Sequence, residues 1–426
     1  MSLKPFELIP RDVLFLRDAR PMEASDAGLG ANWPRPDQLY SAIHHAFLSR
    51  WPNHQDWEGE GLHIFRDKSL EEYRGRSKDK NSDSSLRFGA LKTIGPFPCR
   101  RKTGDNPGKR EVFLPCPLDL GMELIECQGT DLPAPLAFAF SLCHEVKASL
   151  PKWISQDEYR RYFEAAPDSY FTRDGEDWKF VPPTQPDPEL YGADRNIGIG
   201  TDRDSGATRK GAFYQAEYLR LSQDVTMAFM AECMQKGRHV QTSQDIFSLL
   251  PKHEQVIFGG QQGVCMLSPI ESDLFPDLNP AITTPWLRWT LLTPAVFNAG
   301  WLPGWVDGAT GAVQLRAPVE RLPGERRADW KIRQNDQPLL PGRLVAARVG
   351  KPEPFSGWSE AKGKPKPTLL AVPAGSSYVF KCESATEAQA LAQALQHPTP
   401  RSDLFGEKGF GIGVCSSMQP PEATIL

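Results

Sequence analysis

The residues best suited to chemistry lie in one stretch, GADRNIGIGTDRDSGATRKGAFY, which spans positions 192–214. It holds five glycines among arginines and a lysine, and it ends on the aromatic pair Phe213 and Tyr214. Glycine has no Cβ, so backbone N–H groups can come close to a phosphate, while arginine and lysine supply positive charge. Aromatic rings can stack on unpaired bases. The candidate phosphate contacts are Arg195, Gly198, Gly200, Arg203, Arg209 and Lys210.

Neither of two common nucleotide-binding motifs is complete in this stretch. A dinucleotide fingerprint needs the pattern G-x-G-x-x-G, but Gly198 and Gly200 are followed by Arg203 in the third glycine position. The run GATRKGAF at 206–213 has Ala and Phe where a Walker A loop needs Lys and Ser or Thr. Two interpretations stay open: a nucleic-acid contact, or a solvated β-hairpin whose aspartates cancel its basic residues.

A second candidate site lies near the N-terminus, at the end of a strand predicted at 6–18. Arg11, Arg17 and Arg20 lie around this strand end, a place where α+β units often build sites. The glycine-containing loop that follows leads to Arg35, just before a helix predicted at 37–51. A helix N-terminus attracts phosphate. Strand end, arginines, glycine loop and helix start therefore converge on one place, with simple solvation of a sheet edge as the alternative.

Metal and catalytic motifs are missing from the sequence. The eight histidines include no H-E-x-x-H or H-x-x-x-H pair, and no two of the eight cysteines are spaced C-x-x-C. His44 and His45, on the predicted helix, could do acid–base work on a ribose 2′-OH. Adjacent helical residues point about 100° apart, so at most one of them faces a given site, and packing on the helix is the simpler interpretation. We expect no metal, no cofactor and no catalytic residue.

The bulk composition is that of an ordinary globular protein. The 426 residues suggest two or three domains, because a domain takes roughly 100–200 residues. The formal net charge is −4, so a nucleic-acid contact would need a local basic groove. The N-terminus lacks the apolar core of a signal peptide, and no apolar run approaches the roughly 18 residues that span a bilayer. With cysteines scattered along the chain, we expect a cytoplasmic protein with reduced thiols and no membrane partner.

The elements that would position these residues fall into two halves, separated by a proline-containing connection at 272–285. In each half, strands and helices alternate in an order that suits an α+β unit of the βαββαβ kind. A polar segment at 52–88 and a segment rich in proline and aromatic residues at 151–191 read as insertions. The other predicted elements are strand segments within 211–233, a short capped helix at 242–251, strands at 263–270, 286–297, 342–349, 367–372, 376–383 and 409–418, and a helix at 385–396.

Five blocks of the sequence, in this order, resemble one known family. That family is the third subunit of the type III-B (Cmr) CRISPR effector complex, a group within the RAMP superfamily. The order and separation of the blocks make the resemblance specific, and it spans nearly the whole chain. The blocks are IPRDVLFLRDARPM (9–22), WPRPDQLYSAI (33–43), the run 194–220, the run 355–380 and KGFGIGV (408–414).

The resemblance implies an α+β fold of two ferredoxin-like (RRM-like, RAMP) domains with long insertions. The first would cover 1–272, with insertions at about 52–88 and 151–191, and the second 285–426, with a glycine-rich loop at 409–413. It also implies a non-catalytic role in antiviral defence: the chain would grip the 5′ tag of the CRISPR RNA (crRNA). It would cap the backbone by contacting a backbone RAMP subunit, and it would dock the large polymerase/cyclase-type subunit. The RNA-binding residues would be Arg17, Asp18, Arg20, Arg35, Arg195, Gly198, Gly200, Arg203, Arg209, Lys210, Gly409, Phe410, Gly411 and Gly413.

Two other functions remain as alternatives. A RAMP relative cleaves CRISPR repeats with a histidine near the first helix, so His44 or His45 could serve a repeat-processing endoribonuclease. The chain could also be a purely protein-binding scaffold, with the RNA held by neighbouring subunits.

Overall fold

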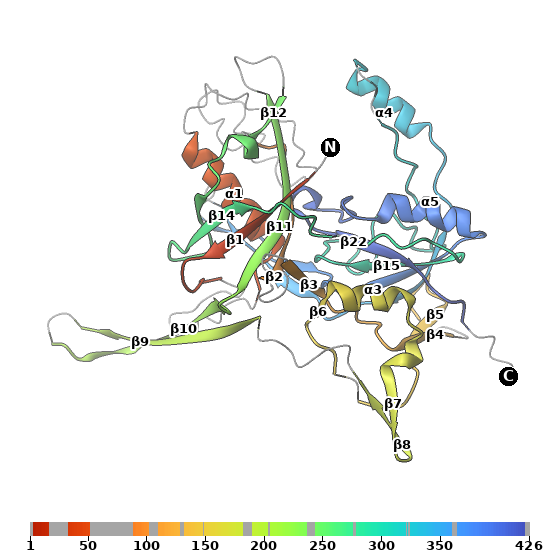
Figure 1. Cartoon of the computed structure of the whole chain (residues 1–426), viewed down its shortest axis with the longest axis horizontal. Coiled ribbons are helices and arrows are strands. Elements are labelled where there is room, and N and C mark those ends of the chain that lie inside the picture. Colours follow the sequence, from red (N-terminus) through yellow and green to blue (C-terminus); the bar gives the residue numbers. More distant parts are fainter. Residues whose placement is uncertain are drawn as a thin grey trace.

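Most strands of the described chain lie in two antiparallel sheets that stand next to each other (Figure 1). The structure is a computed structural model, and it describes residues 3–16, 33–51, 88–101, 110–127, 132–147, 149–181, 190–202, 205–236, 243–275, 278–320, 322, 324–359 and 364–421. Within these residues no helix is both long and apolar enough to cross a membrane. The fold is thus mixed α/β, mostly antiparallel sheet with few helices.

The first sheet is built from residues far apart in the sequence, and every neighbouring pair along it is antiparallel. Inside the sheet, β1 pairs with β14 on one side and with β11 on the other. A short strand, β12 (Ser243–Asp245), adds to the end of β11. In spatial order the sheet runs β13 (Glu254–Ile257), β14 (Val264–Pro269), β1 (Lys4–Pro10), β11 (Val225–Lys236), β2 (Leu91–Arg101), β3 (Arg110–Pro115) and β6 (Trp153–Ser155).

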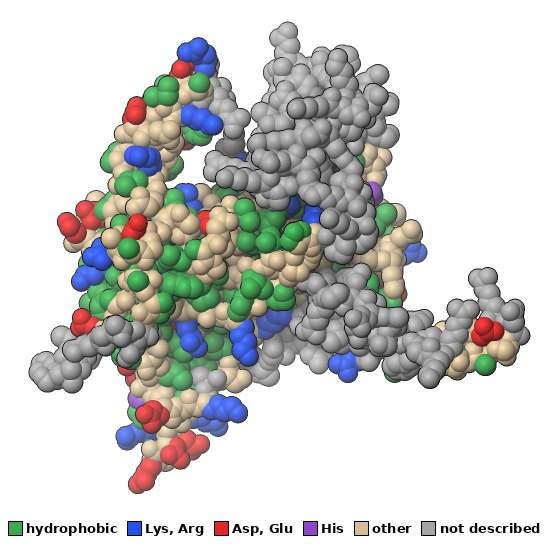
Figure 2. All heavy atoms as spheres, turned by 180° about the vertical axis from the view of Figure 1, so that it is seen from behind, with side chains coloured by type: hydrophobic (Ala, Val, Ile, Leu, Met, Phe, Trp, Pro, Cys, Tyr) green, Lys and Arg blue, Asp and Glu red, His purple; other side chains and the backbone are tan. Residues whose placement is uncertain are grey.

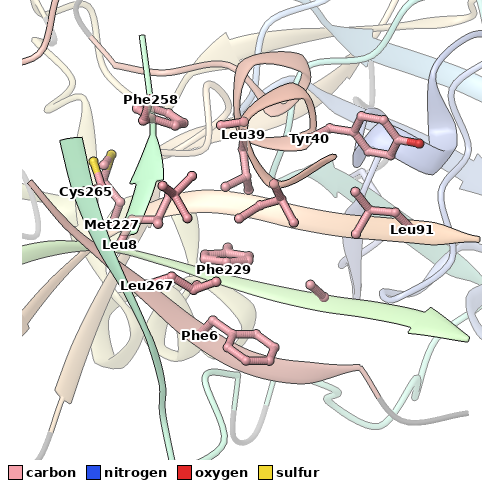
Figure 3. Close-up of a cluster of buried hydrophobic side chains, with 14 of the residues drawn as sticks. Phe6, Leu8, Leu39, Tyr40, Leu91, Met227, Phe229, Phe258, Cys265 and Leu267 are labelled. Atoms are coloured by element: carbon pink, nitrogen blue, oxygen red, sulfur yellow. The ribbon is translucent and has the colours of Figure 1, made fainter. Parts of the chain in front are cut away.

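Helix α1 (Pro36–Arg50) covers one face of this sheet and closes the first core. Proline suits the first helical turn, and the Gln38 side chain accepts a hydrogen bond from the backbone N–H of Arg35 (2.9 Å), which helps begin the helix. Side chains alternate along β1, so Phe6 and Leu8 point into the core that Figure 3 shows. Full burial of such a side chain contributes about 1.5–3 kcal/mol to stability, so this packing holds α1 against the sheet.

The second sheet runs β16 (Arg343–Arg348), β21 (Ser377–Lys381), β15 (Trp286–Leu291) and β22 (Gly413–Ser417), again with antiparallel neighbours. Helix α5 (Ala385–Leu395) covers one face of it. The Ser384 side chain accepts a hydrogen bond from the backbone N–H of Glu387 (3.2 Å) and caps the helix. Leu391 and Leu395 of α5 are buried in a core with Trp289 of β15.

A buried polar cluster joins the two halves. Asp119, in the loop after β3, forms an ion pair with Arg288 of β15 (Nη1 to Oδ2, 3.4 Å). The Tyr162 hydroxyl donates to Asp119 (2.6 Å), and the Arg288 guanidinium lies 3.7 Å from the centre of the Tyr162 ring. Removing one partner of such a pair would leave a buried charge alone, at a cost of about 3–5 kcal/mol. The halves are therefore held together by specific contacts as well as by a shared apolar core.

Three features project from the two sheets in Figure 1. They are the long hairpin β9 (Tyr191–Thr201)–β10 (Thr208–Leu221), the short hairpin β7 (Phe171–Asp174)–β8 (Asp177–Phe180), and an arm that ends in α4 (Arg327–Asn335). The remaining elements are β4 (Met122–Glu126), β5 (Phe138–Leu142), α3 (Gln156–Glu164), β17 (Glu353–Phe355), β18 (Trp358–Ser359), β19 (Lys364–Pro365), β20 (Leu369–Ala371) and the 3₁₀ turns at Pro167–Tyr170, Ile246–Leu249 and Gly406–Lys408.

The expected order of elements is confirmed in most places, but one local prediction was wrong and two helices were not predicted. The helix expected at 242–251 is strand β12 followed by a single 3₁₀ turn, which Asp245 caps and which ends before Pro251. Segment 151–191 contains helix α3, whose buried face is made of tyrosines instead of aliphatic residues. The sequence analysis assigned no element to Arg327–Asn335, which forms helix α4. The predicted insertion at 52–88 lies outside the described residues up to position 87.

Candidate nucleic-acid interface

A hollow of about 420 Å³ opens between the two halves at the start of α1, and we call it the junction cleft. The first half contributes the residues that begin α1, the middle of β2 and the chain leading into β6. The second half contributes the chain after β15, the segment before β17 and the turn before β21. The lining includes Trp33, Arg35, Phe97, Lys152, Trp153, Thr293, Lys351 and Glu353.

Aromatic rings form one side of the junction cleft. The Trp33 ring lies 5.5 Å from the Trp153 ring and 5.2 Å from the Tyr191 ring, between centroids. Hydrogen bonds fix these rings: Trp33 Nε1 donates to the carbonyl of Pro96 (2.8 Å), and Trp153 Nε1 donates to the Tyr191 hydroxyl (3.1 Å). Tyr191 is the first residue of β9, so the same cluster ties the cleft to the base of the long hairpin.

Basic side chains from three separate segments reach the junction cleft. Arg35 pairs with Asp37 (Nε to Oδ1, 3.0 Å) and lies over the Phe355 ring, 5.7 Å from its centre. Lys152 lies 5.5 Å from the centre of the Tyr191 ring. Lys152 and Lys351 are both exposed, and among the described residues neither forms an ion pair within 4.0 Å. On the face shown in Figure 2, Lys and Arg side chains lie below a central hydrophobic area, between the two projecting hairpins.

One carboxylate, Glu353, shares the junction cleft with these cations. Loss of water around the carboxyl group raises the pKa of Glu353, and the positive charges of Lys152 and Arg35 oppose that shift without cancelling it. The residue as a whole is exposed, and it lines the cleft. Among the described lining residues, Glu353 is the one acid against three cations, so the cleft carries a local excess of positive charge in a chain of net charge −4.

The segment that leads to Arg17, Asp18 and Arg20 is held at the base of the long hairpin. Leu14 pairs with Leu219 of β10, and Phe15 pairs with Gly260 in the turn between β13 and β14. A Cβ on Gly259 would lie 2.7 Å from the carbonyl oxygen of Phe15, so glycine is required for this close approach. Arg17, Asp18 and Arg20 themselves lie outside the described residues.

The long hairpin carries the predicted basic stretch. Arg195 of β9 lies opposite Glu217 of β10, with Nε 3.1 Å from Oε1, and Arg220 pairs with Asp194 at 2.6 Å. The simple hairpin interpretation expected the aspartates of the stretch to cancel its own basic residues, but Asp194 pairs with Arg220 outside the stretch, and Arg195, paired with Glu217, remains 63% exposed. Gly198 and Gly200 are in β9; Arg203 and the side chains of Arg209 and Lys210 lie outside the described part.

The glycine-rich loop at 409–413 is buried within the chain. Gly409 and Gly411 have positive φ angles of 87° and 72°, and added Cβ atoms would collide with the Thr93 carbonyl and the Ser402 backbone respectively. Phe410 is fully buried and stacks on Phe355 at 5.3 Å between centroids. The loop, which also includes Gly413, thus packs the halves together and supports the ring beneath Arg35; its direct contact with RNA stays a prediction.

The two histidines of α1 lie in different surroundings. His44 is half-buried and stacks on the Tyr40 ring at 6.0 Å, whereas His45 is exposed. This fits the expectation that at most one of them can face a given site. Searching the described residues for groups of His, Cys, Asp and Glu that could hold a metal ion finds none.

Sequence reasoning missed several members of the junction cleft. Lys152, Trp153 and Lys351 lie in segments without a motif. Tyr191, which contacts the cleft rings, stands one residue before the basic stretch. The one available signal was the adjacency of Lys152 and Trp153 in a segment rich in proline and aromatics. Their proximity to Arg35 depends on how the two halves pack.

Comparison with known proteins gives one family and a few solved structures. The family model described as CRISPR-associated protein (Cas_Cmr3) matches residues 6–415. No curated protein matches the chain.

Three similar solved structures come from CRISPR complexes. A chain of the type III-B Cmr-beta complex bound to cognate target RNA is 15% identical, with a TM-score of 0.41, and the match covers 88% of this chain and 86% of that one. A chain of Cmr-beta bound to cognate target RNA and AMPPnP, state 1, is 12% identical, with a TM-score of 0.42 and coverage of 92% and 90%. A chain of the Csm3–Csm4 subcomplex of the type III-A interference complex is 11% identical, with a TM-score of 0.34 and coverage of 90% and 93%.

Proposed function

Because the chain belongs to the CRISPR-associated Cas_Cmr3 family of type III-B Cmr subunits, we propose that it recognises the 5′ tag of the crRNA in that effector complex. In this role it caps the backbone of the complex, contacts the backbone RAMP subunit and docks the large polymerase/cyclase-type subunit. It acts in antiviral defence, in the cytoplasm, by binding and positioning, without catalysis of its own.

The junction cleft is the observation that carries this proposal. It brings the cations Arg35, Lys152 and Lys351 together with the rings of Trp33 and Trp153. Single-stranded RNA is recognised by this combination, because rings stack on unpaired bases while cations neutralise the phosphates. A cleft of this kind suits the unpaired end of a guide RNA better than a duplex, whose bases are already stacked.

The long hairpin extends the proposed RNA path from the cleft. Tyr191 joins the two, and the segment before residue 17 meets the hairpin base through Leu14. In addition to the cleft residues, the proposed RNA contacts are those predicted from the sequence: Arg17, Asp18, Arg20, Arg195, Gly198, Gly200, Arg203, Arg209, Lys210, Gly409, Phe410, Gly411 and Gly413.

We also propose that each half derives from a ferredoxin-like domain, the first within 1–272 and the second within 285–426. Support comes from strand order. Numbered along the chain, β1, β2, β11 and β14 lie in the order 4-1-3-2, and so do β15, β16, β21 and β22. A ferredoxin-like βαββαβ unit has a helix in each crossover. Here α1 fills the first crossover of the first half, and α5 fills the second crossover of the second half.

Two measurements on purified material test the function. The assembled complex should protect the crRNA tag from an added single-strand nuclease, whereas the complex assembled without this chain should not. The purified chain should leave CRISPR repeat RNA intact in the absence of metal. Cleavage that disappears in the His44→Ala/His45→Ala variant would support the endoribonuclease alternative and contradict the proposal.

A further inference from the structure

We propose that the first sheet carries a docking groove for an acidic, partly apolar, extended segment of another protein. The groove consists of two adjoining hollows of about 910 Å³ and 430 Å³, which share Ile9 and Met266 in their walls. We call it the open-face groove. It lies outside the residues of the junction cleft, so this inference does not rest on the proposed RNA function.

The open-face groove exists because one face of the sheet is only partly covered. Phe6 and Leu8 of β1 point into the core under α1, so Glu7 and Ile9 point to the opposite face. On that opposite face, the core shared by the two halves covers Cys99 of β2 and Ala228 of β11. The hollows lie beyond this cover, over β1 and β14.

Four basic side chains line the open-face groove, together with two carboxylates, those of Glu7 and Glu271. Arg11 stands at one end, and Arg101, Arg110 and Lys252 stand at the other. Glu7 is buried, and a single oxygen of it accepts from both Arg101 Nη2 and Arg110 Nη2, each at 2.8 Å. One carboxylate thus serves two guanidinium groups, and Arg101 stays 45% exposed with donors to spare. The local excess of positive charge is opposite in sign to that of the chain and favours an acidic partner.

The side chains on the floor of the open-face groove suit a bound peptide better than bound RNA. Ile9, Pro10, Val264 and Met266 line it, and neither hollow includes a Trp, Tyr or Phe ring among its described residues. Bases bind single-stranded sites mainly by stacking on such rings, which the junction cleft has and this groove lacks. An extended peptide can instead place aliphatic side chains on this floor and carboxylates on Arg11 and Lys252.

The test uses the purified full-length chain, two labelled peptides and an unlabelled competitor. They are a fluorescein-labelled peptide of alternating glutamate and leucine, the same labelled peptide with lysine in place of glutamate, and an unlabelled oligouridine. Fluorescence anisotropy should show binding of the acidic peptide but not of the lysine peptide, and unlabelled oligouridine, which the junction cleft can bind, should not displace the acidic peptide. Arg11→Glu/Lys252→Glu should weaken that binding roughly tenfold, since each reversal replaces an attraction with a repulsion. The matched control is Lys179→Glu on the exposed surface of β8, which should leave the affinity unchanged.

Each other outcome would overturn the inference. These outcomes are equal binding of both peptides, displacement of the acidic peptide by oligouridine, unchanged affinity in the double variant, and no peptide binding at all. The melting temperature of each variant shows that it is folded. Binding of tag RNA should survive Arg11→Glu/Lys252→Glu; its loss would assign this groove to RNA instead.

Discussion

The rings of Trp33 and Tyr191 lie in contact, with centroids 5.2 Å apart. Trp33 precedes α1 and Tyr191 begins β9, so this contact couples the start of the helix to the base of the long hairpin. Aromatic pairs of this kind contribute about 0.5–1.5 kcal/mol beyond their burial. A strand of RNA that lies along the hairpin would therefore be expected to reach the junction cleft, and the predictions below follow from that geometry.

Removing the unpaired charges of the junction cleft should weaken tag binding. In Lys152→Ala/Lys351→Ala, both exposed cations are lost while the buried core is untouched. Each lost phosphate contact should lower the slope of log affinity against log salt by about 0.7 for single-stranded RNA. A salt titration of tag binding measures this. The control, Lys147→Ala/Lys179→Ala, removes two exposed lysines outside the cleft and should keep the wild-type slope.

The basic residues of the hairpin should contribute in the same way. Arg195→Ala/Arg209→Ala/Lys210→Ala should reduce tag affinity and the salt slope. The pair between Arg195 and Glu217 is at the surface, where such a pair contributes at most about 1 kcal/mol, so the fold should be retained. Glu217→Ala breaks the same pair but keeps the positive charge, and it should bind RNA at least as well as wild type. Weakened binding in Glu217→Ala would mean that the ion pair, and not the charge, is what matters.

How much of this arrangement could be predicted depends on how local each signal is. Helix α1 follows from Pro36 and the spacing of Leu39, Ile43 and Phe47, and α5 follows from Ser384 and an alanine-rich face, because these cues act within one element. The partners of those elements are set by tertiary packing, which no short motif records.

The residues of the junction cleft could likewise be predicted only in part, because tertiary packing brings most of them together. Arg35 was predicted because it precedes a helix, but Lys152 and Lys351 come close to it only when the two halves pack together. The glycines at 409 and 411 were recognised as special, yet their composition cannot distinguish close approach to a ligand from close approach to the chain itself. The structure gives them partners within the chain, at Thr93 and Ser402.

Because the glycine loop 409–413 packs within the chain, substitutions in it should lower the stability of the protein. Gly409→Ala combines a positive φ with a collision against the Thr93 carbonyl, so it should lower the free energy of unfolding by more than about 2 kcal/mol. Gly206 also has a positive φ but open space around it, so Gly206→Ala should cost only about 1 kcal/mol. Gly192→Ala has neither problem and serves as the neutral control. Denaturant unfolding compares the three, and equal losses in all of them would contradict the packing role.

The lowered pKa of Glu7 should make the stability of the protein depend on pH. Burial alone would raise the pKa of Glu7, but hydrogen bonds and charges from Arg110 and Arg101 outweigh it and lower the pKa. A lowered pKa in the folded state means that the stabilisation is complete above the ordinary glutamate pKa of about 4.3 and is lost as the pH falls through the folded value. Melting temperatures of wild type and Glu7→Gln should differ most at neutral pH and converge in acid. A difference that stays constant with pH would show that the charge of Glu7 does not contribute.

The most direct test of RNA recognition is a crosslinking map of the crRNA tag in the assembled type III-B complex. With 4-thiouridine placed at single tag positions, irradiation should attach the RNA to peptides of this chain that contain Trp33, Trp153 or the hairpin residues 191–221. Mass spectrometry would identify those peptides. Tag nucleotides that crosslink to other subunits and never to this chain would contradict the account and favour a purely protein-binding scaffold.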